Sequence, residues 1–301
     1  MARRMPGVRS KGKVRIGLSG WLYKGWRGTF YPEGLPQRRE LSFIGEKFSS
    51  VEINGTFYST QAPSSFARWY ECVPDDFLFA VKCPRFITHM KRLRDVETPL
   101  ANFFASGILR LREKMGPLLW QFPPNFIYRP EVFVPFLDLL PRTTKDAARL
   151  AKKHDDRVRK GTWTSADADR PIRYAVEIRH ESFAVPEFIA LLRKYNIALV
   201  CADTVDWPLL MDVTADFIYC RLHGSTELYK SNYGAKDLAR WATRVAAWSL
   251  GKNAPDGRQI SSAPPRPLPQ RDVFVYFDNT DKVKAPGNAL ALEKRLGLIR
   301  S

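Results

Sequence analysis

Eight short runs of β-branched and aromatic residues alternate with helical patterns, and this alternation constrains the fold more than any other feature. The predicted strands span residues 14–20, 50–54, 77–82, 118–122, 173–179, 198–203, 217–223 and 273–279. Helical spacing covers residues 36–48, 63–73, 98–115, 130–140, 185–195, 235–250 and 288–296, and only the link 204–216 lacks a clear helix. Because each helix returns the chain to the same end of the sheet, the pattern predicts an α/β fold, a single (β/α)8 TIM-type barrel.

One barrel accounts for residues 14–301, since such barrels use about 250 residues. Residues 1–13 are predicted to form a flexible basic arm. Two segments fall outside the strand and helix pattern and are predicted to be insertions. Residues 142–173, which include the first of these segments (142–171), carry ten basic and five acidic residues, and residues 252–270 are rich in proline and serine.

The formal charge of +17 arises from 48 basic and 31 acidic residues, so the chain is a basic protein suited to anionic partners. Much of the excess lies in the arm and in segment 142–171. Such charged segments are also typical of solubilising surfaces. A nucleic-acid or polyanion partner is therefore one hypothesis among several.

Several classes of protein are disfavoured by what the sequence lacks. No apolar run approaches the roughly 20 residues of a membrane helix, and the basic N-terminus lacks the apolar core of a signal peptide. The four cysteines form no CxxC pair, which favours buried thiols in a cytoplasmic protein. The motifs HExxH and the glycine-rich phosphate loop are absent as well.

Polar residues gather where the predicted strands end, which is where barrel enzymes carry their active sites. They are Glu52, Asn54, Lys82, Gln121, Glu177, Arg179, His180, Asp203, Arg221, His223, Asp278 and Asn279. Alternation along a strand places Glu52 with Asn54, and Arg221 with His223, on the same face. Two interpretations stay open: a binding site in the barrel mouth, or internal ion pairs that hold the strands together.

As an enzyme site, this cluster predicts catalytic roles for Glu52 and Glu177 as general acid and base, with His223 assisting proton transfer and Lys82 as a catalytic cation. The predicted substrate-binding residues are Trp21, Asn54, Tyr58, His89, Gln121, Arg179, Asp203, Arg221 and Asn279. Glu177, Asp203 and His223 also have the ligand chemistry of a divalent metal site, so a metal cofactor is an open hypothesis. No oligomeric state is predicted.

Two features have a second interpretation that involves no ligand. The aromatic segment after the first strand, which includes Trp21 and Trp26, can stack on sugars or bases or can pack as a lid. His89 can be a site residue or a loop residue that hydrogen-bonds to backbone. The sequence does not choose between these interpretations.

Seven segments occur in an order that resembles the YecE-like family, catalogued as domain of unknown function 72: GLSGWLYKGWRGTFYP, SVEINGTFYST, FAVKCPRFITH, LLWQFPPNF, AVEIRHESF, YCRLHG and VYFDNT. The resemblance implies a TIM-type barrel but no particular reaction, because the family has no assigned activity. The family pattern is matched at Gly20, Trp21, Glu52, Asn54, Phe57, Tyr58, Lys82, Thr88, His89, Gln121, Pro123, Pro124, Glu177, Arg179, Arg221, His223, Gly224 and Asn279. The chain departs from it at Phe183, where the family usually has tryptophan, and at Asp278, where it usually has asparagine.

Two functions follow as hypotheses. The first is an enzyme acting on a small anionic, sugar or sugar-phosphate-like substrate, in analogy with the metal-dependent sugar isomerases that share the barrel. The alternative is a nucleic-acid or polyanion-binding protein, endonuclease-like by the same analogy, that would use the arm, the charged insertion and the aromatic segment.

Overall fold

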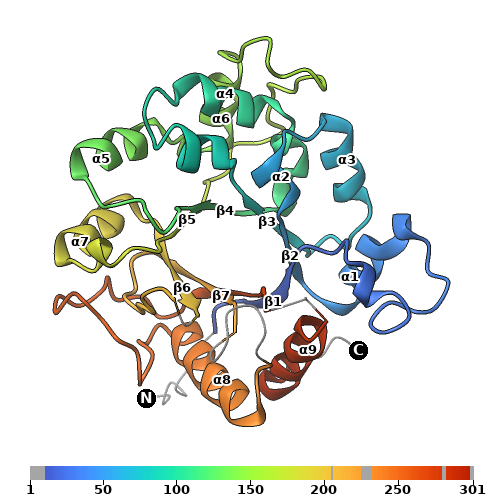
Figure 1. Cartoon of the computed structure of the whole chain (residues 1–301), viewed down its shortest axis with the longest axis vertical. Helices are drawn as coiled ribbons and strands as arrows, with labels where there is room; N and C mark the ends of the chain where they lie inside the picture. Colours follow the sequence, from blue (N-terminus) through green and yellow to red (C-terminus); the bar gives the residue numbers. More distant parts are fainter. Residues whose placement is uncertain (1–10, 205, 225–231, 280–282, 299–301) are drawn as a thin grey trace, which may run out of the picture.

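The computed structural model describes residues 11–204, 206–224, 232–279 and 283–298, so most of the predicted arm lies outside the described residues. Eight parallel strands pair in sequence order and close into a barrel, which confirms the predicted (β/α)8 fold (Figure 1). The strands are β1 Val14–Ser19, β2 Ser50–Ile53, β3 Leu78–Lys82, β4 Met115–Gln121, β5 Tyr174–Glu177, β6 Ala198–Asp203, β7 Phe217–Leu222 and β8 Asp272–Phe277.

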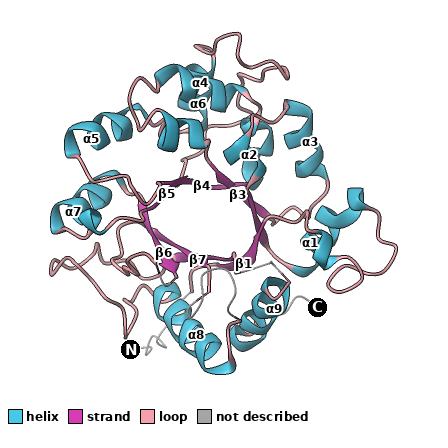
Figure 2. Cartoon of the chain, viewed as in Figure 1, coloured by secondary structure: helices cyan, strands magenta, loops and turns pink. Residues whose placement is uncertain are grey.

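Helices surround the ring of strands, as Figure 2 shows. They are α1 Glu40–Lys47, α2 Gly55–Tyr58, α3 Pro63–Glu71, α4 Glu97–Ala105, α5 Pro130–Leu139, α6 Thr144–Ala151, α7 Pro186–Tyr195, α8 Ala235–Ser249 and α9 Ala285–Leu296. Shorter helical turns are η1 Lys24–Trp26, η2 Gln37–Arg39, the π-helix η3 Phe86–Met90, η4 Ile108–Lys114 and η5 Glu181–Phe183. Within the described part of the chain, no helix has the length and apolar character needed to cross a bilayer.

The helix predicted over residues 98–115 is interrupted. Gly107 adopts φ = 105°, a left-handed conformation that ends α4 and starts the turn η4. A Cβ atom at this position would lie 2.5 Å from the Cα of Pro63, so glycine is also required for close packing. Residues 108–114 of the predicted helix form η4, and its last residue, Met115, is the first residue of β4.

Segment 142–171, predicted as an insertion, contains the helix α6, which lies beside α4 (Figure 1). The side chains of Thr143 and Asp146 cap its first turn reciprocally, a capping signal that the sequence analysis overlooked. Residues 252–270 are all described and form neither helix nor strand. At the end of the predicted arm, Gly12 donates a hydrogen bond to the Ser249 carbonyl, so residues 12 and 13 are held against the barrel.

Two apolar clusters fill the molecule, one between strands and helices and a smaller one inside the barrel. The inner cluster consists of Ala80, Leu119, Ala175, Ala198, Val200, Ala202, Ala215, Phe217, Tyr219, Phe274 and Tyr276. It defines which residues of each strand face inward, because alternate residues share a face. All four cysteines are free thiols, three of them buried.

Candidate functional site

Arg221 of β7 lies at the centre of a buried ion-pair network inside the barrel. Its guanidinium donates to both oxygens of Glu52, from Nη2 at 2.9 Å and from Nε at 3.1 Å. Nη1 donates to Glu177 Oε2 at 2.6 Å, and Nη2 donates to Asp278 Oδ2 at 2.8 Å. One cation thus holds together carboxylates from β2, β5 and the end of β8.

The two glutamates of this network are already engaged by the protein. Burial opposes ionisation of Glu177, but the arginines beside it outweigh burial and hold its pKa well below the usual range. Each oxygen of Glu52 accepts two hydrogen bonds, which come from Ser19, Tyr219 and the guanidinium of Arg221. Glu52 is therefore placed to position Arg221 rather than to exchange protons with a ligand.

Lys82, at the end of β3, faces the same mouth but takes no part in these ion pairs. Lys82 is 8% exposed, and its Nζ forms no hydrogen bond or salt bridge with the described residues. The Nζ atom lies 4.1 Å from the centre of the Phe57 ring. Burial, followed by the charge of Arg221, lowers the pKa of Lys82 to about 8. Lys82 is thus a buried amine that titrates close to neutral pH.

The π-helix Phe86–Met90 brings the His89 ring against the Phe57 ring, which it meets edge to face at 5.2 Å. Burial and then nearby cations, Arg179 before Lys82, lower the pKa of His89 to about 4. His89 is consequently neutral at physiological pH. Phe57, which the site prediction omitted, lies between the two titratable groups, and its place in the GTFY sequence after β2 was the available signal.

Arg179 forms one wall of the mouth. Its Nε donates to Glu177 Oε1 at 2.8 Å, its Nη2 lies 2.7 Å from the same oxygen, and the Trp207 ring covers its guanidinium at 3.8 Å. Trp207 also meets the ring of His223 edge to face at 5.6 Å, and His223 Nδ1 lies 3.3 Å from Asp278 Oδ2. Trp207 was not predicted, because it belongs to the link 204–216, whose described residues form no helix.

Two buried amide oxygens beside Lys82 lack a hydrogen-bond donor in the described part of the chain, namely Asn54 Oδ1 and Gln121 Oε1. The pairing of β2 with β3 places Asn54 next to Lys82, and the pairing of Lys82 with Leu119 places Gln121 one step further along the same face. A buried acceptor without a donor costs about 1–3 kcal/mol. These oxygens are suited to accept hydrogen bonds from a ligand.

Asp203 and Asn279 do not lie in the mouth as predicted. Alternation along each strand places both residues on its outer face, toward the helices. Asp203 accepts a hydrogen bond from Trp241 Nε1 of α8 at 3.0 Å, and Asn279 donates to Asn288 of α9 at 2.9 Å. Burial raises the pKa of Asp203 in this position. They connect the barrel to its outer helices.

The metal site predicted from Glu177, Asp203 and His223 is not assembled, because the Asp203 carboxylate points away from the other two side chains. Among the described residues, no three histidine, cysteine, aspartate or glutamate side chains come together as metal ligands. The carboxylates that do converge surround the Arg221 guanidinium, which occupies the place that a cation would take.

The predicted aromatic residues pack rather than line the mouth. Trp21 is 8% exposed and meets Trp69 of α3 edge to face at 5.5 Å, and Trp26 is fully buried. The lid interpretation of this segment is therefore favoured. Tyr58 lies at the rim, 67% exposed, with the guanidinium of Arg85 5.5 Å from its ring centre.

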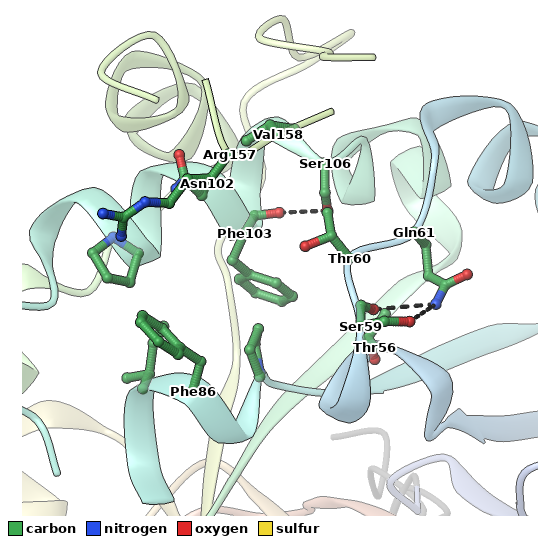
Figure 3. A pocket seen from close by; sticks show the side chains of 13 residues that line it. Thr56, Ser59, Thr60, Gln61, Phe86, Asn102, Phe103, Ser106, Arg157 and Val158 are labelled. Atoms are coloured by element: carbon green, nitrogen blue, oxygen red, sulfur yellow. Dashed lines mark hydrogen bonds between the residues drawn. The ribbon is translucent and has the colours of Figure 1, made fainter. Parts of the chain in front are cut away.

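Two hollows lie near the mouth but outside it. A cavity of about 210 Å³ is bordered by α2, η3 and α4; it contains no inward-facing strand residue, and Figure 3 shows Phe86 and Phe103 on one side and Ser59 and Gln61 on the other. A second hollow of about 350 Å³, here called the basic groove, is lined by Met90, Lys91, Arg92, Arg94, Phe126, Ile127, Arg129 and Val132.

The curated relatives align with less than half of this chain, and the aligned part is less than half of each relative. The chain is 32% identical to UPF0759 protein YecE of Escherichia coli K12 over 130 residues, which are 42% of this chain and 44% of YecE. It is 27% identical to UPF0759 protein YunF of Bacillus subtilis over 118 residues, 38% of this chain and 41% of YunF. These alignments therefore span well under two thirds of either relative.

Solved structures are similar over almost the whole chain. A crystal structure of a DUF72 family protein from Thermotoga maritima superposes with a TM-score of 0.71 at 26% identity, covering 95% of this chain and 99% of that one. A DUF72 family protein from Enterococcus faecalis gives a TM-score of 0.66 at 19% identity, covering 96% and 97%, and shows the shared fold. The model of the family described as "Protein of unknown function DUF72" matches residues 15–301, and the chain belongs to this family.

Proposed function

We propose that this protein is an enzyme whose site is the barrel mouth and whose substrate is a small hydroxylated anion, such as a sugar phosphate or a sugar acid. The observation that carries the proposal is Lys82, a buried amine without an ion-pair partner among the described residues. Burying a charge that makes no direct ion pair is costly, and an anionic ligand that pairs with it would lower that cost.

The charges around the mouth are unevenly distributed. Carboxylates gather on the Arg221 side, where they are bound to its guanidinium. Around His89, burial and then four cations lower its pKa, namely Arg179, Lys82, Arg85 and Arg92, of which Arg179 is paired with Glu177 of the network. The anionic group of a substrate fits beside Lys82 and His89, because there it would meet positive charge.

Hydroxyl groups on the substrate would complete the polar contacts of the mouth. Asn54 Oδ1 and Gln121 Oε1 both need donors, and they lie on the strands that flank Lys82. A polyhydroxylated ligand carries several hydroxyl donors along its chain. In this arrangement Lys82 and His89 are the groups available for proton transfer, and Arg221 with its carboxylates fixes the strands that carry the site.

A ligand panel tests this function. Sugar phosphates, sugar acids and the uncharged parent sugars would be screened by thermal shift, followed by calorimetry on the strongest hits. We expect a hydroxylated anion to raise the melting temperature of the wild type and not of Lys82→Gln. Lys47→Gln is the matched control. Lys47 is exposed at the last residue of α1, close to the start of β2, and therefore lies at the end of the barrel opposite to the mouth. Binding that survives in Lys82→Gln would overturn the proposal.

The basic groove favours a second candidate function, binding of a single-stranded nucleic acid. Four cations line this hollow together with Phe126 and Ile127, and Ile127 is 47% exposed. Phosphates would contact the cations, and bases would pack against the exposed side chains of Met90 and Ile127. We expect affinity for an oligonucleotide to fall steeply with salt and to decrease further in Arg94→Gln/Arg129→Gln. Binding unaffected by these substitutions would exclude the groove.

A further inference from the structure

We infer that Lys82 is a nucleophile that condenses with an aldehyde or ketone of the substrate to form an imine. This inference rests on the proposed function and narrows its substrate class to hydroxylated anions that carry a carbonyl group. It also assigns the mouth to carbonyl chemistry such as isomerisation or carbon–carbon bond cleavage.

The surroundings of Lys82 differ from those of the other deeply buried lysine in the described part of the chain. Lys114 is 3% exposed, and its Nζ donates to the carbonyls of Tyr70 and Val73 at 2.9 and 2.8 Å and lies 3.5 Å from Asp75. These contacts satisfy the hydrogen-bond donors of the Lys114 side chain. Lys82 has no such contacts, so its lone pair can become available for reaction.

The position of Lys82 is nevertheless well defined. Thr56 Oγ1 donates to the Lys82 carbonyl at 2.7 Å, and the Phe57 ring supports the amine at 4.1 Å. The amine therefore lies over an apolar surface, near Asn54 and Gln121, whose free oxygens can hold hydroxyl groups next to the reacting carbonyl. A nucleophile held in one place reacts faster because less entropy is lost on reaction.

An amine must be neutral to attack a carbonyl carbon. The pKa of Lys82, lowered to about 8 by burial and by Arg221, meets this need. At pH 7 about one tenth of such amines are neutral, compared with fewer than about one in a thousand ordinary lysines. Lysines activated by desolvation and by a neighbouring cation are established Schiff-base formers in other enzymes.

The chemical steps balance without a further reactant. The Nζ lone pair forms a bond to the carbonyl carbon while one proton moves from Nζ to the carbonyl oxygen, which yields a neutral carbinolamine. The hydroxyl group then takes one proton that comes from solvent and leaves as water with the C–O electron pair, while the nitrogen lone pair forms the C=N bond of the protonated imine. Neutral His89, against the same Phe57 ring, is suited to relay these protons. The protonated imine withdraws electrons from the adjacent carbon, which weakens its C–H or C–C bond.

Pentane-2,4-dione is the probe for the test, since it forms a stable enaminone with a neutral lysine without a reductant or a known substrate. We expect one adduct per chain, located at Lys82 by peptide mass mapping, with a rate that rises with pH around a midpoint near 8. Lys82→Gln should lose this adduct and Lys47→Gln should keep it. Circular dichroism of each variant verifies that the barrel is folded.

The outcomes separate the inference from the proposed function. If glycerol 3-phosphate, which has no carbonyl, binds in a Lys82-dependent manner but Lys82 reacts no faster than exposed lysines, imine formation is refuted and the anion site stands. If Lys82 reacts selectively while no anion from the panel binds, the anion site fails. Modification spread evenly over exposed lysines would also refute the inference.

Discussion

The ammonium group of Lys82 lies 4.1 Å from the centre of the Phe57 ring, and the His89 ring meets the same ring edge to face at 5.2 Å. One aromatic side chain thus contacts two titratable groups whose pKa values are both lowered, to about 8 and about 4. Desolvation is the first cause in each case, because burial disfavours the charged form of a base. This arrangement motivates the predictions for both residues.

Replacing Lys82 by methionine should stabilise the protein at pH 7. The folded state holds this lysine with a pKa of about 8 instead of 10.5, so below pH 8 the charged amine destabilises the fold by about 3 kcal/mol. The penalty is relieved as the pH rises from 8 to 10.5, since the folded state loses its proton first. Urea unfolding of wild type and Lys82→Met at several pH values would show a difference that shrinks over this window.

Lys236→Met is the matched control for that comparison, because Lys236 is exposed on α8. Its effect should stay within about 0.5 kcal/mol and be independent of pH, as for ordinary surface substitutions. A Lys82→Met variant less stable than wild type at pH 7 would contradict the pKa assigned to Lys82.

His89 should remain neutral well below the pH at which ordinary histidines become charged. Its folded pKa of about 4 lies below the ordinary value of 6.5, so the unfolded chain takes up the proton first as the pH falls. Stability contributed by neutral His89 is therefore lost between pH 6.5 and 4. NMR titration of the imidazole signals, assigned with His89→Gln, measures the midpoint directly, and a midpoint near 6.5 would disprove the prediction.

Replacing Arg221 by methionine should destabilise the fold by at least about 3–5 kcal/mol, because three carboxylates would lose their shared buried cation. Urea unfolding provides the measurement. The control is Arg258→Met, which removes an exposed ion pair with Glu181 at 3.1 Å and should cost less than about 1 kcal/mol. Similar losses in the two variants would mean that the buried network contributes little to stability.

Asp203→Ala should lower stability while leaving ligand binding unchanged. The substitution removes the acceptor of the buried Trp241 indole N–H, which costs about 1–3 kcal/mol. Asp203→Asn keeps an acceptor oxygen and should restore most of the loss. Unfolding experiments and thermal shifts with the best ligand of the panel would be measured in parallel. Weaker ligand binding in both variants would contradict the prediction and would show that Asp203 contributes to the ligand site.

Local sequence patterns were enough to predict the barrel and the end of it that carries polar residues. Eight strands with intervening helices admit one closed parallel arrangement, and the strand ends at Glu52, Lys82, Glu177 and Arg221 were identified from local pattern alone. These features depend on short-range periodicity and on a topological rule, both of which are encoded locally along the chain.

Which strand-end residues face inward could be established from the tertiary structure alone. In β6 every residue is buried, so alternation along the strand carries no polarity signal, and Asp203 lies on the helix side while Ala202 lies inside. The structure likewise decided that Arg221 gathers Glu52, Glu177 and Asp278, which leaves Lys82 apart from them. Which charges pair depends on distances across the barrel between strands far apart in sequence, and no local pattern contains those distances.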